Sequence, residues 1–547
     1  MKRLLIWICL LVVTHAGAQN RTVGLFTNDS TAYNGYTLFT SDRTTYLIDN
    51  CGHEIKRWVS NYFPGNSVYL LENGNLLRPC RIGGSFTGGG IGGRIEMFDW
   101  NGQLIWAWQY ANDQVHQHHD VAPLPNGNIL VPAWERKTSA EAVALGRKPN
   151  TVPANGLWPD HVVEIKPVGS DSAQIVWEWH LWDHLVQDVD PDKPGFGSPA
   201  DHPELLNINA GNINVSDWVH VNAVSYNPEL DQIALSSRSL SEIWIIDHST
   251  TTAEAASHNG GLYNKGGDFL YRWGNPQAYG RGTAATQRFY GQHDVRWITA
   301  PHPWAGKLMV FNNGPGRPGG NFSSVDVWSP PLNAQGGYEL SNSGPFAPLV
   351  AEWGYQAAGF YSSNISGAHP LPNGHFLVCE GDRGRFFEID TLGNMLWDYI
   401  NPVSLNGPVI QGQTPANNST FRATRYAPDY PAFAGKDMTP GALIEKNPLP
   451  GDCIIYNGFV SINNDPDIAP TVVVRGNPVQ DILLLDNHTG QPISLLLTDA
   501  LGHILLNQTY SGEQIALHTG SWPSGLLMLR AISTEQAQPF LFTLIKP

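Results

Sequence analysis

The sequence is poor in charge and has no long apolar segment beyond its N-terminus. Only 15% of its 547 residues are charged, and the formal net charge is -16. Nucleic acids and anionic membranes require a broad basic surface, so we expect no nucleic-acid partner. No later segment approaches the roughly 20 apolar residues that span a bilayer. The few cysteines are widely separated and form no CxxC pair, so no metal site is predicted.

Glycine, proline and tryptophan are abundant instead, with 56, 40 and 19 residues. This composition favours many short strands joined by turns over long charged helices. The length indicates more than one domain. We therefore predict an all-β protein with at least two domains.

The N-terminus has the pattern of a secretory signal peptide. Lys2 and Arg3 precede an apolar run, and the small residues 16–18 provide a cleavage site. We predict a signal peptide over residues 1–18 and a protein that is secreted or held at the cell surface after passing through the periplasm. Export places the other cysteines where disulfides form, and the sequence leaves all three pairings open among Cys51, Cys80, Cys379 and Cys453.

Two phrases alternate along the chain. The first is a β-rich stretch, a polar turn and an apolar residue next to an aromatic one, at residues 44–58, 94–108, 161–179, 242–273, 324–353 and 385–399. The second is an apolar strand often preceded by a Pro-Asn-Gly turn, at residues 69–77, 123–131, 226–237 and 370–378. A hairpin unit repeated about six times is typical of a β-propeller. We predict a six-bladed β-propeller over residues 22–460; a β-helix or a pair of sandwiches is the alternative.

Three histidines and an acid begin the strand HQHHDVAPLPNGNILV, residues 116–131. The innermost strand of a propeller blade starts at the channel mouth, so polar residues at one phase of each repeat converge on one pocket. A lone histidine near a turn is usually a structural group, but three in register predict a shared site. Alignment on the turns gives these matches: His119-Asp120 with His293-Asp294, and His118 and Asp120 with His220 and Asn222.

Four segments resemble the bacterial arylsulfate sulfotransferases. They are DWVHVNAVSYNPELDQIALSSRSLSEIWIID (217–247), GQHDVRW (291–297), HHDVAPLPNGNILV (118–131) and SGAHPLPNGHFLVCEGDRGRFFEID (366–390). The resemblance covers roughly residues 35–435. It implies a six-bladed propeller whose channel holds histidines and one arginine, with one histidine transiently sulfated.

Carried over residue by residue, the resemblance makes His293 the nucleophile that receives the sulfuryl group. His220 and Arg238 would hold the sulfuryl oxygens, and His119 would assist proton transfer. A neutral imidazole is a good nucleophile near pH 7, and guanidinium and imidazole N–H groups suit sulfate oxygens. Further substrate-binding positions are His118, which could replace His119 in proton transfer, Asn222 and His369.

The implied reaction moves a sulfuryl group from a phenolic sulfate ester to a phenolic acceptor through a sulfohistidine intermediate. Aryl sulfates and phenols are the expected partners, and no cofactor is expected because the histidine itself carries the group. The alternative is a non-catalytic secreted propeller that serves as a binding or adhesion module.

Two other motifs are weaker. Residues 88–93 (GGGIGG) fit GxGxxG but lead into a strand, so we predict a flexible channel loop and not a dinucleotide site. Asp188, Asp190 and Asp192 lack the Gly and distal Glu of an EF-hand loop, so a solvated loop is favoured over a calcium site.

The sequence changes in character after about residue 465. We predict a linker over residues 461–471, and the short apolar runs that follow predict a small immunoglobulin-like β-sandwich over 472–547. Its NPVQD, DALGHIL and SGLLMLRA segments resemble the C-terminal sorting domains of type IX secretion, which implies the secretion machinery as a partner. An ordinary accessory module is the alternative.

Overall fold

The structure is a computed structural model that describes residues 20–211, 214–333, 336–451, 453–456, 472–475, 482–488, 491–499, 503–533 and 540–546. The predicted signal peptide and linker lie outside these residues. The chain divides into two compact units, Met1–Gly458 and Phe459–Pro547. No helix among the described residues is both long enough and apolar enough to cross a membrane.

Six antiparallel sheets, numbered here 1 to 6, make up most of the described part of the first unit. Sheet 1 contains β30 (Ala423–Tyr426), β2 (Tyr36–Ser41), β3 (Thr44–Ile48) and β4 (Glu54–Val59). Sheet 2 contains β5 (Tyr69–Leu70), β6 (Leu76–Arg81), β7 (Gly93–Phe98) and β8 (Leu104–Gln109). Sheet 3 contains β10 (Ala122–Pro123), β11 (Ile129–Glu135), β12 (Asp160–Val168) and β13 (Ser172–His180), and β9 (Val115–Gln117) also pairs with β11.

The other three large sheets follow in chain order. Sheet 4 contains β16 (Val221–Asn227), β17 (Gln232–Ser237), β18 (Glu242–Asp247) and β19 (Tyr271–Trp273). Sheet 5 contains β20 (His293–Trp297), β21 (Leu308–Asn312), β22 (Ser324–Trp328) and β23 (Trp353–Tyr355). Sheet 6 contains β24 (Gly367–Pro370), β25 (Phe376–Glu380), β26 (Arg385–Ile389), β27 (Met395–Ile400) and β1 (Gly24–Asn28).

Short elements fill the connections of the first unit. Two small pairs are β14 (Leu185–Val186) with β15 (Leu206–Asn207) and β28 (Val403–Ser404) with β29 (Gly407–Pro408). The α-helices are α1 (Ser139–Ala144) and α2 (Thr252–Ala255). Single 3-10 turns are η1 (Pro149–Thr151), η2 (Leu181–Asp183), η3 (Pro276–Tyr279), η4 (Ala284–Thr286), η5 (Gly381–Arg383) and η6 (Pro431–Phe433).

The repeated phrases correspond to fixed strands of these sheets. The six copies of the first phrase form the third and fourth strands, and the copies of the second phrase span the hairpin between the first and second strands. The Asn-Gly turns of that hairpin place Gly74, Gly127 and Gly374 at φ 87°, 85° and 90°, where a side chain would be strained. The all-β prediction is confirmed.

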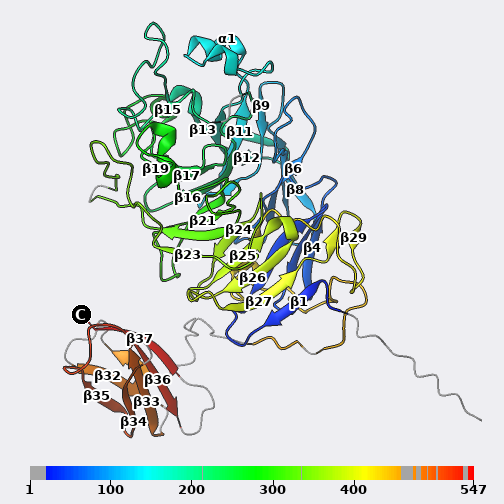
Figure 1. The fold of residues 1–547 in the computed structure, drawn as a ribbon. Helices are drawn as coiled ribbons and strands as arrows, with labels where there is room; N and C mark the ends of the chain where they lie inside the picture. The colour runs from blue at the N-terminus through cyan, green and yellow to red at the C-terminus, as the bar shows by residue number, and fades with distance from the viewer. Residues whose placement is uncertain are drawn as a thin grey trace, which may run out of the picture. The chain divides into compact units, whose positions relative to one another are not determined.

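Strands from the two ends of the first unit join the same sheets. β30 pairs with β2, so residues 423–426 complete a sheet that begins at residue 36. β1 pairs with β27, and Figure 1 shows this blue strand beside the yellow ones of sheet 6. Both pairings tie the beginning of the unit to its end.

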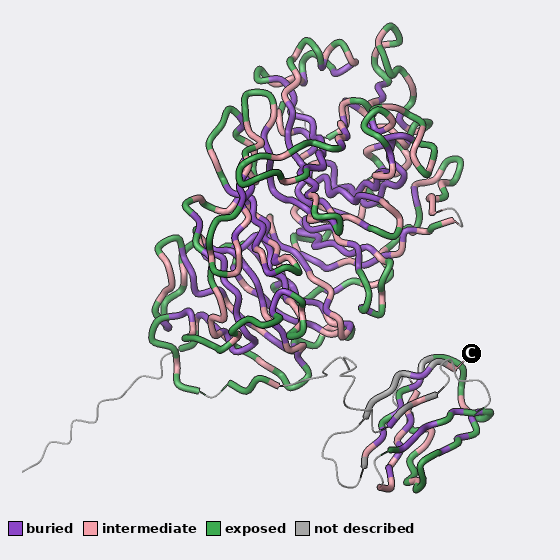
Figure 2. Tube along the Cα trace, turned by 180° about the vertical axis from the view of Figure 1, so that it is seen from behind, coloured by how far each residue is buried: buried purple, intermediate pink, exposed green. Residues whose placement is uncertain are grey.

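Apolar side chains fill the space between neighbouring sheets. Figure 2 shows buried backbone running through the interior of the larger unit, with exposed loops at its margin. One buried cluster joins residues of sheets 3 and 4, and a second joins sheets 4 and 5. Fully buried indoles are prominent among the largest core residues: Trp58, Trp134, Trp179, Trp218, Trp244, Trp328 and Trp397.

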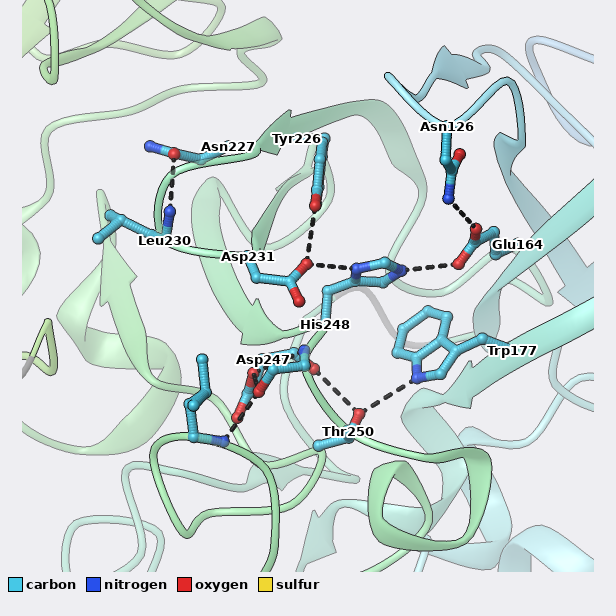
Figure 3. A network of polar contacts seen from close by, with 12 residues as sticks. Asn126, Glu164, Trp177, Tyr226, Asn227, Leu230, Asp231, Asp247, His248 and Thr250 are labelled. Carbon is cyan, nitrogen blue, oxygen red and sulfur yellow. Dashed lines mark hydrogen bonds and ion pairs between the residues drawn. The ribbon is translucent and has the colours of Figure 1, made fainter.

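A polar network also connects sheets 3 and 4 (Figure 3). His248 lies between two carboxylates, with its Nδ1 2.6 Å from Asp231 and its Nε2 3.0 Å from Glu164. Glu164 belongs to β12, whereas Asp231 and His248 flank strands of sheet 4. Burial lowers the pKa of His248, but the hydrogen bonds to Glu164 and Asp231 outweigh it and raise the pKa above its ordinary value.

One disulfide closes the first unit. Cys51, in the turn after β3, is bonded to Cys453, while Cys80 and Cys379 are buried free thiols. The sequence left three pairings of the four cysteines open. The structure contains the Cys51–Cys453 bond of one of these pairings, and the remaining two cysteines, Cys80 and Cys379, are not bonded to each other.

The second unit has two antiparallel sheets among its described residues. One contains β31 (Val472–Arg475), β32 (Ile482–Asn487) and β35 (Gln514–His518). The other contains β34 (Ile504–Tyr510), β33 (Ile493–Asp499), β36 (Gly525–Ser533) and β37 (Phe540–Lys546). Buried apolar residues of both sheets form one cluster.

Candidate active site

The predicted histidines lie where the first strands of sheets 3, 4 and 5 begin. We call His118, His119, His220 and His293 the histidine cluster. The rings of His119 and His220 are 4.5 Å apart in a T-shaped contact, and those of His118 and His119 are 5.1 Å apart. The charges of His220 and His293 both lower the pKa of His119, after the larger effect of burial. Three sheets thus bring imidazoles to one place.

His293 is buried and has a fixed orientation. Its Nδ1 is 2.7 Å from Oδ1 of Asn313. The amide nitrogen of Asn313 donates to the carbonyl oxygens of Ser362 and Ile365, both at 2.9 Å, so its oxygen must face the imidazole. Nδ1 of His293 therefore carries the hydrogen, and Nε2 carries the free lone pair.

Positive charge surrounds His293. Burial is the largest cause that lowers its pKa well below the ordinary range, and the guanidinium of Arg238 is the next. Arg238 is half-buried, and its backbone N–H donates to the carbonyl oxygen of His220 at 3.0 Å. His293 therefore stays neutral at pH 7, next to a cation that can bind an anion.

His220 is paired with a carboxylate. Its Nδ1 is 2.5 Å from Oδ2 of Asp217, and Oδ1 of Asp217 accepts a hydrogen bond from the Trp134 indole at 2.9 Å. A carboxylate on Nδ1 leaves Nε2 of His220 to accept or donate a proton. The carboxylate and the indole together fix the plane of the ring.

His118 supports His119 from behind. Its Nδ1 is 2.8 Å from Nδ1 of His119, its Nε2 is 2.7 Å from Asp160, and its ring stacks on Trp134 with centroids 4.1 Å apart. Burial lowers the pKa of His118 to about 3 and raises that of Asp160. Nδ1 of His118 is thus paired with His119, whereas its buried Nε2 lies close to Asp160 without forming a hydrogen bond to any described residue.

The glycine-rich segment 88–93 lies against the histidine cluster. The N–H of His119 donates to the carbonyl oxygen of Gly90 at 2.7 Å. A Cβ on Gly90 would lie 2.1 Å from Nε2 of His119, and one on Gly89 would lie 3.3 Å from the His220 ring. The glycines are needed because backbone packs directly on imidazoles.

Next to the histidine cluster is a group of ion pairs, which we call the ion-pair layer. It consists of Asp120, Asp294 and Arg422. Arg422 is 2.7 Å from Asp120 and 2.9 Å from Asp294, and all three side chains are buried. The two carboxylates also accept backbone N–H groups of Val224 and Ala368 from the next sheets. The layer therefore ties the first strands of sheets 3 to 6 together.

A cavity of about 270 Å³ begins at this layer. Asp294 and Arg422 line it together with residues farther along the first strands, including Pro123, Val224 and Arg296. The ion-pair layer therefore separates this cavity from the histidine cluster.

Two predicted substrate-binding residues have different surroundings. Asn222 is fully buried beside the cluster, where its Nδ2 donates to the carbonyl oxygen of Gln292 at 2.8 Å and its Oδ1 has no partner among the described residues. Across the described residues, no hydrogen bond or ring contact joins His369 to the histidine cluster. The charges that lower the pKa of His369, after burial, include Arg296 and Arg425. The structure does not bring His369 to the other predicted residues.

Sequence reasoning missed residues that complete the site. Phe421 lies 6.2 Å from the His119 ring and 6.5 Å from that of His293, and Arg422 follows it. They come from the segment STFRATRY, which no repeat covers because it supplies the closing strand of sheet 1. Asp217 lies within the DWVHVN motif, so the motif could have indicated its role at the site. Asn313 and Asp160 lie outside the motifs, and nothing in the sequence indicates their roles.

Structures of low similarity cover most of the chain. They include a protein of unknown function from Bacteroides caccae, with 11% identity, 72% of this chain and 98% of that chain covered, and a TM-score of 0.39. Virginiamycin B lyase from Staphylococcus aureus has 8% identity, with 70% and 89% covered and a TM-score of 0.31. PorZ, a surface component of the type IX secretion system of Porphyromonas gingivalis, has 9% identity, with 96% and 75% covered and a TM-score of 0.22.

No curated protein matches the chain. The model of the arylsulfotransferase (ASST) family matches residues 21–396, which include the histidine cluster and Arg238. This match spans more than half of the sequence and supports aryl sulfotransferase activity in general. The chain belongs to the arylsulfotransferase family.

Proposed function

We propose that the six sheets are the blades of a closed six-bladed β-propeller and that the histidine cluster transfers sulfuryl groups between phenols. Four-stranded meanders in chain order support the blades, and the pairing of β30 with β2 supports closure. The observation that carries the reaction is the contact between His293 and Asn313. It leaves one buried, neutral imidazole nitrogen free as a nucleophile.

The sulfuryl group would sit between His293 and Arg238. A sulfate monoester carries one negative charge on its oxygens, and the transfer depends on positioning and on charge stabilisation. Arg238 is the half-buried cation whose charge acts most strongly on His293. Its planar fork of N–H groups suits two oxygens of the transferring group. The buried Oδ1 of Asn222 cannot bind an anion, so we assign Asn222 a positioning role.

His220 is the group that we assign to proton transfer. Its pairing with Asp217 resembles the histidine–carboxylate arrangement of acyl-transfer enzymes, in which a carboxylate on Nδ1 stabilises the imidazolium. His119 was the expected residue, but burial and its neighbours lower its pKa well below the ordinary range. His119 stays the second candidate, and its ring holds His220 in place.

The cycle has two steps with balanced atoms. In the first, the Nε2 lone pair of His293 forms an N–S bond, the S–O bond to the aryl group breaks, and protonated His220 gives its proton to the leaving phenolate. In the second, the acceptor phenol gives its proton to His220, its oxygen attacks sulfur, and the N–S bond breaks. Both imidazoles return to their starting state.

Donor-only labelling tests the nucleophile. An aryl sulfate supplied without acceptor should leave a sulfuryl adduct on the peptide that contains residues 291–297, detected by mass spectrometry at neutral or basic pH. His293→Ala should lose both label and turnover. The matched control is His202→Ala, since the side chain of His202 is 46% exposed and its one ion pair among the described residues is with Glu204. Full turnover by His293→Ala would reject the covalent mechanism.

A turnover assay with an aryl sulfate and an acceptor also distinguishes the proposed enzyme from the alternative, a binding or adhesion module. A binding or adhesion module would release no phenol from an aryl sulfate in the presence of acceptor. Leaving-group dependence separates the two proton-transfer candidates: the residue that donates the proton should lose least activity with acidic phenols, which leave without a proton. We expect this rescue in His220→Ala and not in His119→Ala.

We also propose that the protein is exported and that the second unit acts as a sorting domain. The disulfide between Cys51 and Cys453 supports an oxidising compartment, since such bonds are rare in the cytosol. Deletion of residues 470–547 should leave the protein in the periplasm of its host. Normal appearance of the truncated protein outside the cell would overturn the sorting assignment.

A further inference from the structure

Three potential metal ligands meet away from the histidine cluster. His184 lies in the connection after β13, whereas His258 and Asp268 lie in the connection between β18 and β19. Figure 1 shows β13 and β19 in neighbouring sheets. One ligand atom from each residue lies within 4.8 Å of those of the other two. The three residues therefore link the insertions of two sheets.

Both imidazoles face the same carboxylate oxygen. Nδ1 of His184 is 2.7 Å from Oδ1 of Asp268, and Nδ1 of His258 is 2.8 Å from the same atom. Around a tetrahedral zinc ion with bonds of about 2.1 Å, ligand atoms lie about 3.4 Å apart. Side-chain shifts below about 1 Å would therefore admit the ion.

The contact made by Nε2 of His184 determines which ring nitrogen carries the hydrogen in the neutral imidazole. Nε2 is 2.8 Å from the carbonyl oxygen of Ala255, which can only accept, so Nε2 carries the hydrogen. In a neutral imidazole, Nδ1 then has a lone pair that points at a carboxylate oxygen, another acceptor. A cation between them resolves this contact, and a backbone carbonyl on the far nitrogen is the usual support of a metal-bound histidine.

The surrounding residues hold His184 in place before any ion binds. Its ring is fully buried and stacks on Trp179 at an interplanar angle of 5°. The Trp179 indole donates to the carbonyl oxygen of Gly267 at 2.7 Å, and a Cβ on Gly267 would lie 2.5 Å from Nε2 of His184. Such a fixed ligand loses little freedom on binding.

We propose that His184, His258 and Asp268 form a Zn²⁺ site that joins the two insertions. Two imidazole nitrogens and a carboxylate oxygen are a common zinc ligand set. His258 is 59% exposed, so the ion can enter from solvent, and water can fill the fourth position. The sequence predicted no metal because the ligands are spread over two distant insertions, with no cysteine among them.

Zinc titration of the full-length protein tests the site. Protein stripped with EDTA is titrated with Zn²⁺ by calorimetry, and bound zinc is counted by plasma mass spectrometry. Because the histidine cluster also offers imidazoles, the comparison is between variants. Wild type should bind about one equivalent more than His258→Gln, and loss of this ligand should weaken that equivalent by at least about 100-fold.

Controls keep the test independent of folding and of the sulfuryl chemistry. His258→Gln changes an exposed side chain, and His202→Gln is a matched exposed histidine that should bind zinc like wild type. Zinc should raise the melting temperature of wild type and of His202→Gln more than that of His258→Gln. Equal zinc content in wild type and His258→Gln, or no bound zinc in wild type, would overturn the proposal, whatever the enzyme's activity.

Discussion

Replacement of Arg422 by leucine should destabilise the first unit strongly. Arg422 is 6% exposed and neutralises Asp120 and Asp294, which are 0% and 2% exposed. Removal of one partner from a buried ion pair costs about 3–5 kcal/mol, because a desolvated charge is left behind. Here two carboxylates lose their shared cation. Each keeps other donors, such as the Tyr69 hydroxyl on Asp120 at 2.8 Å and Arg296 on Asp294 at 2.9 Å. We therefore expect one such penalty and not two.

The loss is measured by equilibrium unfolding. Urea unfolding near pH 7, followed by tryptophan fluorescence, gives the change in midpoint. The exposed Arg57→Leu is the matched control, with an expected change within about 0.5 kcal/mol.

A double variant separates charge from packing. Arg422→Leu combined with Asp120→Asn removes the cation together with the carboxylate that loses its ion pair, while Asp294 keeps its ion pair with Arg296. The double variant should recover part of the lost stability, because Asp120 no longer carries an unpaired buried charge. A change below about 1 kcal/mol in Arg422→Leu, or no recovery in the double variant, would refute our view of this layer.

Other predictions rest on single contacts. His248 has a raised pKa, so its contribution to stability should be full below about pH 6.5 and be lost as the pH rises through the raised value; His248→Ala should flatten this part of the unfolding-midpoint profile. Asn313→Ala should lower kcat about tenfold or more, because the lost hydrogen bond of about 1.5 kcal/mol orients the nucleophile. The melting temperature should also fall, because the buried carbonyl oxygens of Ser362 and Ile365 lose their donor. Gly90→Ala should abolish turnover, because the added Cβ would collide with the ring of His119. The control is Gly102→Ala, which has a similar φ but open space around its Cβ. It should lower the unfolding free energy in urea by only about 1–2 kcal/mol, through backbone strain, and leave turnover unchanged. Cys51→Ala should lower the unfolding free energy by about 2–5 kcal/mol and speed proteolysis near residue 453, and equal protease resistance of the variant would contradict this role.

The sequence predicted the strands well because their turns are local. An Asn-Gly pair between two apolar runs specifies a hairpin whatever lies around it, and the repeated phrases therefore marked the correct pairs of strands. The histidines of the cluster were found because each lies at the start of the first strand of its sheet or within four residues before it. His369 stands in the same phrase, but three residues beyond the matched Ser366, and its ring lies among other charges.

What the sequence did not predict depends on contacts between distant segments. Asn313 orients His293 from another strand end, and Asp160 reaches His118 across sheet 3. Arg422 comes from a segment that precedes β30, about 300 residues after its partner Asp120. No periodicity connects such positions, because each partner was fixed by how the sheets pack and not by its own neighbours in the chain.

The backbone at the site has a strained conformation that the residue types do not predict. His119, His220 and Asp294 have φ of 55°, 52° and 60°, a left-handed conformation that costs a residue with a Cβ about 1–2 kcal/mol. Neighbouring contacts hold it: the His119 N–H donates to Gly90, and the His220 carbonyl oxygen accepts from Arg238. A single left-handed residue turns the chain sharply between the incoming loop and the first strand. Such strain persists only where the surroundings determine it, and it clusters at functional sites. Left-handed residues near the start of the first strand in three successive sheets are therefore independent support for a shared site, and they are a property of the backbone that residue types alone do not reveal.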